Sequence, residues 1–208
     1  GAVWIPQLRR RTVPGGPGTF KLPATLALRT SLGSQLDGVP EVHAPLMLPP
    51  GRRTYRQIGY RESGEVGYLE FSFPGGAMST DQCRSLLAAY RHAQARPVKV
   101  IVFGPPRDFF GNGIHLNVIQ AAADPAAESW RNINAIYDLV HAILTNTGQL
   151  TVAALAGNAA AGGLMLALAA DQVWCRSGAV LNPHYRLMGL HGSEYWTYVL
   201  PRRIGHEL

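Results

Sequence analysis

The sequence predicts an α/β fold with a parallel sheet, and two observations predict it. Short apolar segments of strand length alternate along the chain with longer segments whose apolar residues recur at helical spacing. Strands that alternate with helices in this way form a parallel sheet in a layered structure. The 208 residues, 47% of them apolar and 15% charged, suffice for one sizeable domain with a buried core.

The first strand and helix are expected at residues 66–74 and 79–97. The segment VGYLEFSFP alternates as a half-buried strand does. The helix opens with Ser79 and Gln82 at capping-box spacing and stops at Pro97. The side chains predicted to face the core are Leu69, Phe71 and Phe73 on the strand, and Cys83, Leu86, Leu87 and Tyr90 on the helix.

Two further strands are expected at residues 98–103 and 150–157, each apolar enough to be buried on both faces. Between them Asp124 and Pro125 occupy the N-cap and first position of a helix that runs to Gly148. Its predicted apolar stripe is Trp130, Ile133, Ile136, Tyr137, Val140, Ile143 and Leu144.

The last expected elements follow the second of these strands. Residues 164–171 are apolar on every side, which is typical of a helix enclosed by protein. Residues 172–185 read as another short strand and a turn.

The charge of the chain is concentrated near its beginning. Residues 1–62 carry nine Arg or Lys against three acidic residues, whereas residues 63–208 carry ten of each. A neutral body argues against a nucleic-acid-binding protein, and a solvated linker is the favoured interpretation of the basic segment. Residues 1–54, rich in Pro, Gly and Arg, are expected to form an extended segment, and residues 55–208 the folded domain.

Other function classes are disfavoured by what the sequence lacks. The two cysteines are far apart without metal-ligand spacing, so neither a zinc site nor a disulfide framework is expected. The sequence has no apolar run of membrane-spanning length and no secretory leader, so we expect a cytoplasmic protein without a membrane segment. Because the sequence begins with Gly1, we expect it to be a piece of a longer chain.

Two glycine-containing loops are the candidate functional features. Gly162 and Gly163 lie where a buried strand turns into a buried helix, and the first N–H groups of a helix have no partner within it. The loop DFFGNGIHL (108–116) leaves another strand and offers N–H groups around Gly113 and Ile114. If both loops meet at the carboxyl ends of neighbouring strands, they form a two-donor oxyanion hole.

Tight packing is the alternative explanation of the glycines. Neither loop matches a dinucleotide-binding or phosphate-binding motif, and no G-x-S-x-G segment offers a nucleophilic serine.

The segments DFFGNGIHLNVI and LTVAALAGNAAAGGLMLALAAD resemble the paired signatures of the crotonase, or enoyl-CoA hydratase/isomerase, superfamily. The resemblance implies a spiral of ββα turns that binds an acyl-CoA, with its thioester oxygen held by the amides of Ile114 and Gly162. Gly113 and Gly163 would then lie beside the substrate. Met165 stands where the first catalytic glutamate of hydratases is found, and NPHYRLMG replaces the segment of the second. Since Met165 cannot transfer a proton, simple hydration of an enoyl-CoA is not expected.

Longer segments, such as LNPHYRLMGLHGSEYWTYVLPRRIG, are similar to a family of hydrogenase-maturation proteins. In that family a formyltransferase-type half precedes a crotonase-like half. The resemblance implies that residues 1–54 are the end of the first half plus a linker. It implies that residues 55–208 form a lyase that splits formyl-CoA into CoA and CO, the latter a ligand of [NiFe]-hydrogenase. Formyl-tetrahydrofolate would be used only by the preceding half, and other maturation proteins are possible partners.

Decarbonylation needs a proton acceptor and a proton donor. We expect Glu194 to be the acceptor and Tyr185 the donor or orienting hydroxyl, because both lie in the region of the missing glutamate. Glu194 as a first-turn residue behind a Ser193 cap, and Tyr185 as a core phenol, are the alternatives.

The remaining candidates have weaker signals. His115 and His184 are candidate contacts of the substrate, with a structural hydrogen-bonding role as the alternative for His115. The residues expected to form pocket wall and core are Tyr195, Trp196 and Tyr198, and Arg131 is expected on a solvated helix face. An ordinary acyl-CoA hydratase, isomerase or hydrolase, a non-catalytic module that binds CoA or a partner, and a nucleic-acid role for the basic segment are the competing functions.

Overall fold

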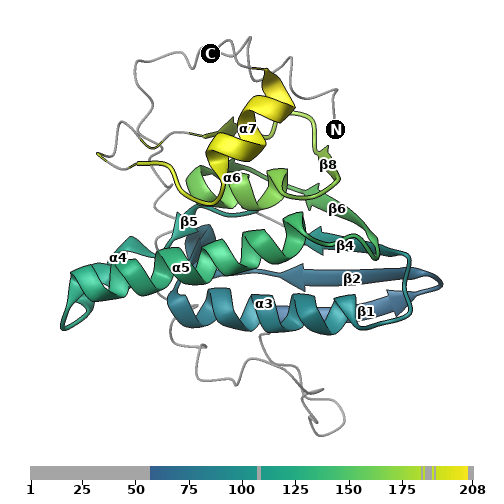
Figure 1. The fold of residues 1–208 in the computed structure, drawn as a ribbon, viewed down its shortest axis with the longest axis horizontal. Coiled ribbons are helices and arrows are strands. Elements are labelled where there is room, and N and C mark those ends of the chain that lie inside the picture. The colour runs from purple at the N-terminus through teal and green to yellow at the C-terminus, as the bar shows by residue number, and fades with distance from the viewer. Residues whose placement is uncertain (1–56, 107–108, 184, 186–188, 190, 206–208) are drawn as a thin grey trace, which may run out of the picture.

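A five-stranded sheet with helices on one face forms the body of the protein (Figure 1). The computed structural model describes residues 57–106, 109–183, 185, 189 and 191–205. The extended segment expected at residues 1–54 therefore lies outside the described residues. The strands, in spatial order, are β1 (Ile58–Ser63), β2 (Val66–Phe71), β4 (Val100–Gly104), β6 (Leu150–Leu155) and β8 (Gln172–Cys175). Only β1 runs antiparallel to its neighbour, so the predicted parallel sheet is confirmed from β2 onward.

The chain repeats one unit: a strand of this sheet, a short strand beside it and then a helix. In the last described unit a loop separates the short strand from the helix. The short strands pair as β3 (Ala77–Met78) with β5 (Gly113–Ile114), and β7 (Ala159–Ala160) with β9 (Leu181–Asn182). The helices are α3 (Thr80–Gln94), α4 (Leu116–Ala121), α5 (Pro125–Leu144), α6 (Ala161–Leu168) and α7 (Trp196–Ile204). A one-turn 3-10 helix, η1 (Pro74–Gly76), precedes β3. The expected spiral of ββα turns is confirmed.

Local signals placed two helix starts correctly. Ser79 accepts a hydrogen bond from Gln82 N, and Gln82 Oε1 accepts one from Ser79 N, so the capping box is complete. Asp124 accepts a hydrogen bond from Ala127 N, and Pro125 is the first residue of α5. The predicted apolar residues of β2 and α3 are all buried.

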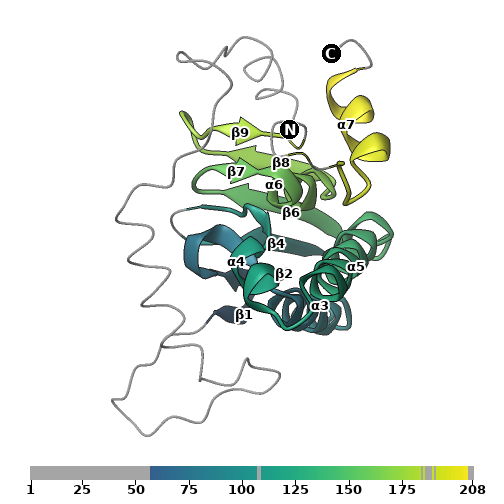
Figure 2. The same cartoon turned by 90° about the vertical axis from the view of Figure 1, so that its left-hand side faces the viewer.

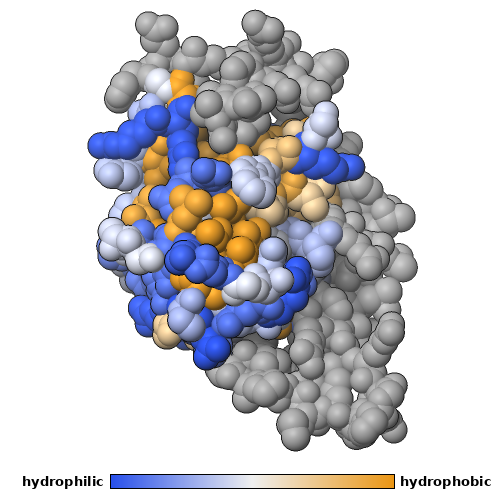
Figure 3. All heavy atoms as spheres, turned by 90° about the vertical axis from the view of Figure 1, so that its right-hand side faces the viewer, coloured by the Kyte–Doolittle hydropathy of each residue, from blue (hydrophilic) through white to orange (hydrophobic). Residues whose placement is uncertain are grey.

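The burial predicted for two strands and for one helix residue was wrong. Strand β4 was expected to be buried on both faces, but Val100 and Val102 are only half-buried because α3, α5 and α6 all cover the opposite face (Figure 2). Strand β6 was expected to be buried as well, but Leu150 at its start is 42% exposed. Figure 3 shows an apolar area, ringed by polar side chains, on the side of the molecule where β4 and β6 begin. Trp130, predicted in the core, is 70% exposed because the first turns of α5 extend with α4 beyond the sheet.

Helix α6 is buried at every residue, as predicted, and it begins three residues earlier than expected. None of the helices in the described part of the chain combines the length and the apolar character that crossing a membrane requires.

Candidate functional site

Three loops meet at the carboxyl ends of β2, β4 and β6. The first loop follows β2 and contains η1, the second follows β4, and the third follows β6. Asn112 N donates to Gly76 O at 2.6 Å, which joins the first loop to the second. Phe110 N donates to Asn158 O at 2.7 Å, and Ala160 N donates to Gly111 O at 2.9 Å, which joins the second loop to the third. Because the strands are parallel and adjacent, their carboxyl ends fall at one edge of the sheet. The two glycine-containing loops predicted to meet therefore do so.

The glycines allow the loops to touch backbone against backbone. Gly113 has φ +84°, and a methyl group on it would lie 3.0 Å from Gly162 N. A methyl group on Gly163 would overlap the carbonyl of Gly111 and lie 2.6 Å from Asn112 N. The contact of Gly163 is thus with protein backbone, in agreement with the tight-packing interpretation for this residue.

The two predicted oxyanion donors lie on either side of this contact. Ile114 follows Gly113 in β5 and is paired with Met78 of β3. Gly162 is the second residue of α6, so its N–H belongs to the first turn, which has no acceptor within the helix. The positive end of the α6 dipole stabilises negative charge at this point. We name the contact of Gly111–Ile114 with Ala160–Gly163 the glycine junction.

Glu194 and Tyr185 face the glycine junction as a hydrogen-bonded pair. The hydroxyl of Tyr185 donates to Glu194 Oε2 at 2.9 Å, and Glu194 is only 2% exposed. A methyl group on Gly162 would lie 2.6 Å from Glu194 Oε1. The absence of a side chain at residue 162 therefore lets a buried carboxylate come up against the start of α6.

Burial dominates the protonation of both groups. It raises the pKa of Glu194 above its ordinary value, although hydrogen bonds from Ser193 and Tyr185 oppose the rise. Burial and the nearby Glu194 carboxylate raise the pKa of Tyr185 as well. The phenol therefore stays protonated and donates to the carboxylate, and it cannot act as a base at neutral pH.

The backbone at Glu194 is strained. Glu194 and Tyr195 both have left-handed backbone angles, φ +53° and +57°, which residues other than glycine rarely adopt. Helix α7 begins only at Trp196, so the alternative that placed Glu194 in a helical first turn is wrong. Aromatic packing holds the segment in place, since the ring of Tyr195 contacts Tyr137 of α5 edge-on with 4.8 Å between centroids.

The other predicted residues have mostly structural surroundings. Met165 is completely buried in the apolar core. His115 is the N-cap of α4, where its Nδ1 accepts a hydrogen bond from Val118 N at 3.4 Å. His184 lies outside the described residues. Arg131 is exposed, as expected, and forms an ion pair with Glu128.

The prediction for the aromatic group holds for two residues of three. Tyr195 and Trp196 are partly buried and pack against the core. Tyr198 is 52% exposed, which contradicts its predicted burial, because it lies on the outer side of α7 under the guanidinium of Arg202.

Two polar residues near the site were not predicted from the sequence. Asn132 of α5 is completely buried and bonded to the segment that carries Ile114. Asn112 Oδ1 is buried without a hydrogen-bond partner among the described residues. The sequence held no signal for either, because polar residues on a helix and in a loop are ordinarily solvated. Nor do three or more His, Cys, Asp or Glu side chains gather as a metal site anywhere in the described ranges.

A match to a protein-family model shows to which family the chain belongs. Residues 62–208 match the model of the enoyl-CoA hydratase/isomerase family, and this range contains the whole glycine junction. The chain belongs to the enoyl-CoA hydratase/isomerase family. Solved members of this family share the fold: an enoyl-CoA hydratase from Bacillus halodurans superposes with a TM-score of 0.65 over 73% of this chain and 62% of its own, at 23% identity.

Two other relatives are more similar to this chain than the Bacillus halodurans enzyme is. The hydrogenase maturation factor HoxX of Bradyrhizobium diazoefficiens is 49% identical over 206 residues, which are 99% of this chain and 34% of that protein. The crystal structure of HypX from Aquifex aeolicus in complex with tetrahydrofolic acid is 49% identical, with a TM-score of 0.75 over 89% of this chain and 32% of its own. The chain spans about a third of the length of these two relatives.

Proposed function

We propose that this chain catalyses the decarbonylation of formyl-CoA to CO and CoA. The observation that carries the proposal is the position of Glu194. It is a buried carboxylate, bonded to Tyr185, that lies against Gly162 where the two glycine-containing loops meet. In the proposal the thioester oxygen accepts hydrogen bonds from the amides of Ile114 and Gly162, which polarise the carbonyl. Gly113 and Gly163 bring the two loops close enough for this.

The proposed reaction needs no oxidant or metal to balance. The Glu194 carboxylate removes the proton of the formyl C–H bond, and that electron pair stays on carbon as the lone pair of CO. The C–S bond breaks with its electrons on sulfur, and the thiolate takes up a proton to give CoA. Burial makes Glu194 a stronger base when it is ionised, because its raised pKa reflects a costly charge.

Tyr185 orients the carboxylate in this scheme. Its hydroxyl bonds Oε2, and Oε1 is the oxygen nearer to Gly162, so the proposal assigns the formyl proton to Oε1. Because the pKa of Tyr185 is raised, its hydroxyl remains a donor throughout the pH range in which Glu194 ionises.

The similarity to HoxX and HypX supports a place in hydrogenase maturation. In the proposal the CO becomes a ligand of [NiFe]-hydrogenase, the formyl group comes from formyl-tetrahydrofolate through a part of the protein outside this sequence, and other maturation proteins are the partners. The proposal places the reaction in the cytoplasm, in keeping with the absence of paired cysteines from the sequence.

The test supplies formyl-CoA to the purified protein and captures CO with a reduced haem protein. Glu194→Gln should lower the rate of CO formation by about 100-fold or more, since it removes the general base. Tyr185→Phe should have a smaller effect, because the carboxylate remains. Matched controls are Glu70→Gln and Tyr68→Phe, since both residues lie on β2, where Arg61 contacts each of them. Undiminished CO release from both site variants would refute the assigned roles.

An isomerase or hydratase is the second candidate, because relatives of this family carry those names. Isomerisation of an enoyl-CoA needs only one proton-transferring carboxylate, and Glu194 could supply it. Turnover of crotonyl-CoA or of a 3-enoyl-CoA, without CO from formyl-CoA, would favour this candidate. Binding of CoA without turnover of either substrate would favour a non-catalytic module.

A further inference from the structure

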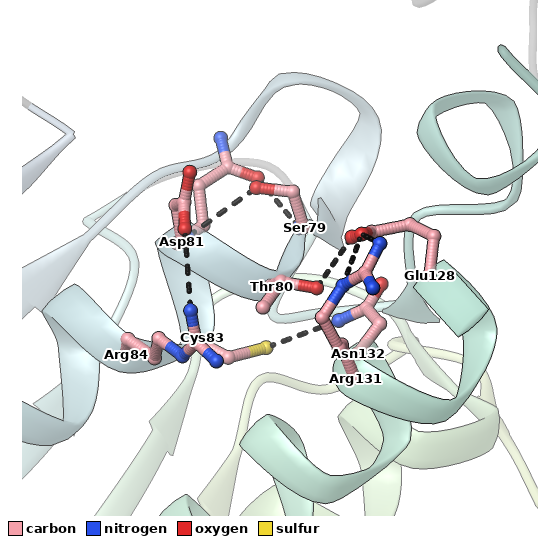
Figure 4. Close-up of polar contacts among 9 residues, drawn as sticks. Ser79, Thr80, Asp81, Cys83, Arg84, Glu128, Arg131 and Asn132 are labelled. Carbon is pink, nitrogen blue, oxygen red and sulfur yellow. Dashed lines mark hydrogen bonds and ion pairs between the residues drawn. The ribbon is translucent and has the colours of Figure 1, made fainter. Parts of the chain in front are cut away.

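Asn132 joins three segments of chain from the middle of α5. Its Nδ2 donates to Met78 O at 3.0 Å and contacts Cys83 Sγ at 3.6 Å, and its Oδ1 accepts from His115 N at 3.1 Å (Figure 4 shows the contact with Cys83). The side chain is completely buried. A buried amide is costly unless its donors and acceptor are used, and here both ends are used.

The partners of Asn132 lie at the carboxyl ends of the two parallel strands of the short sheet that carries Ile114. Met78 ends β3, and His115 directly follows β5, in which Ile114 pairs with Met78. Asn132 therefore holds both strands of this sheet to α5, with one hydrogen bond to each strand.

The bond to His115 N fixes the peptide group that follows Ile114. The peptide group that precedes Ile114 belongs to Gly113, which has φ +84° and packs so close to α6 that a methyl group on it would lie 3.0 Å from Gly162 N. The direction of the Ile114 N–H is thus set from both sides, by a glycine that packs against α6 and by an asparagine anchored in α5.

We propose that Asn132 is a positioning residue for acyl-thioester polarisation: it orients the Ile114 amide without touching the substrate. This inference rests on the proposed function, because it concerns the same pair of amides. An error of about 1 Å in the position of one donor lowers turnover by roughly 10- to 100-fold.

The test compares two buried polar residues replaced by apolar ones of similar size. Asn132→Leu removes the anchor of Ile114. Thr151→Val instead removes a hydroxyl that is bonded to Asp171 near the start of strand β6, at the opposite end of the large sheet. The probe is crotonyl-CoA labelled with ¹³C at the thioester carbonyl, and its carbonyl stretch is measured by infrared spectroscopy when it is bound. CoA itself, which has no acyl carbonyl, is titrated in parallel.

The wild type and Thr151→Val should both lower the carbonyl frequency, and Asn132→Leu should return it towards the value in solution while CoA affinity stays within about twofold. Asn132→Asp, which keeps an acceptor for His115 N–H, should give an intermediate shift and serves if the leucine variant does not fold. A full wild-type shift in the folded Asn132 variants would overturn the inference alone. No shift in the wild type would instead refute the oxyanion site on which the inference rests.

Discussion

Two glutamates of this protein, Glu194 and Glu128, have opposite surroundings. Glu128, in the first turn of α5, accepts hydrogen bonds from Thr80 at 2.5 Å and from Arg131 at 2.8 Å (Figure 4). These bonds lower its pKa. Glu194 is buried, and its burial raises its pKa; no cation of the described residues counteracts this rise.

The difference separates a structural carboxylate from one suited to chemistry. Glu128 joins the start of α5 to the start of α3, and its charge is neutralised where it stands. Glu194 lies at a strained backbone position beside a helix start, where the cost of burying its charge outweighs the hydrogen bonds from Ser193 and Tyr185. Perturbed pKa values and strain gather at functional sites, which favours Glu194 as the reactive group.

The largest effect is expected from closing the glycine junction itself. Gly163→Ala places a methyl group on the carbonyl of Gly111, and backbone must move to admit it. We expect a loss of about 3 kcal/mol in the free energy of unfolding, measured by urea denaturation. Gly59→Ala is the control, because nothing lies within 4 Å of its added methyl group. Equal stability of the two variants would show that the loops are not packed as described.

Gly162→Ala should affect activity more than stability. Its methyl group meets the carboxylate of Glu194, which is the end of a flexible side chain and can turn away. We expect CO formation to fall by at least about tenfold, because the displaced carboxylate loses its position. Thermal unfolding of the same sample gives the comparison with stability. A variant that unfolds like wild type and keeps full CO formation would separate Glu194 from the reaction.

The smallest effects are the pH dependences of stability, and they should have opposite signs. The pKa of Glu194 is raised in the folded state, so the wild type loses stability as the pH rises above about 4.5, the value in the unfolded chain. The stability of Glu194→Gln relative to the wild type should therefore increase with pH. A lowered folded-state pKa means that the contribution of Glu128 is present above the same value and is lost as pH falls below it. Glu128→Gln should therefore approach the wild type at low pH.

Urea denaturation of both variants between pH 3 and pH 8 measures these slopes. Parallel curves for the two variants would mean that the contrast between the glutamates does not exist.

The sequence allowed the prediction of features that depend on neighbouring residues. The capping box of α3, the Asp124-Pro125 start of α5 and the alternation in β2 are local patterns, and the structure confirms them. Strand β1 was not predicted, because it lies at the edge of the sheet beside β2 and most of its residues are partly or fully exposed, so it lacks a clear apolar pattern. Trp130 was misplaced because spacing shows which face of a helix is apolar but not where the sheet beneath it ends.

The site depends on contacts between distant residues, and only part of it was predictable. The meeting of the glycine-containing loops followed from their position after parallel strands. The approach of Glu194 to Gly162, 32 residues away, followed from no local pattern, and it needs the left-handed turn at Glu194 and Tyr195. Asn132 was missed for the same reason, since its partners at Met78 and His115 lie on other segments.

The most direct measurement follows the fate of formyl-CoA labelled with ¹³C and with deuterium at the formyl group. We predict labelled CO and free CoA in equal amounts, formed more slowly from the deuterated substrate, with the rate lowered by about 100-fold or more in Glu194→Gln and normal in Glu128→Gln. Labelled formate as the main product, or CO formed at the same rate by Glu194→Gln, would contradict this prediction.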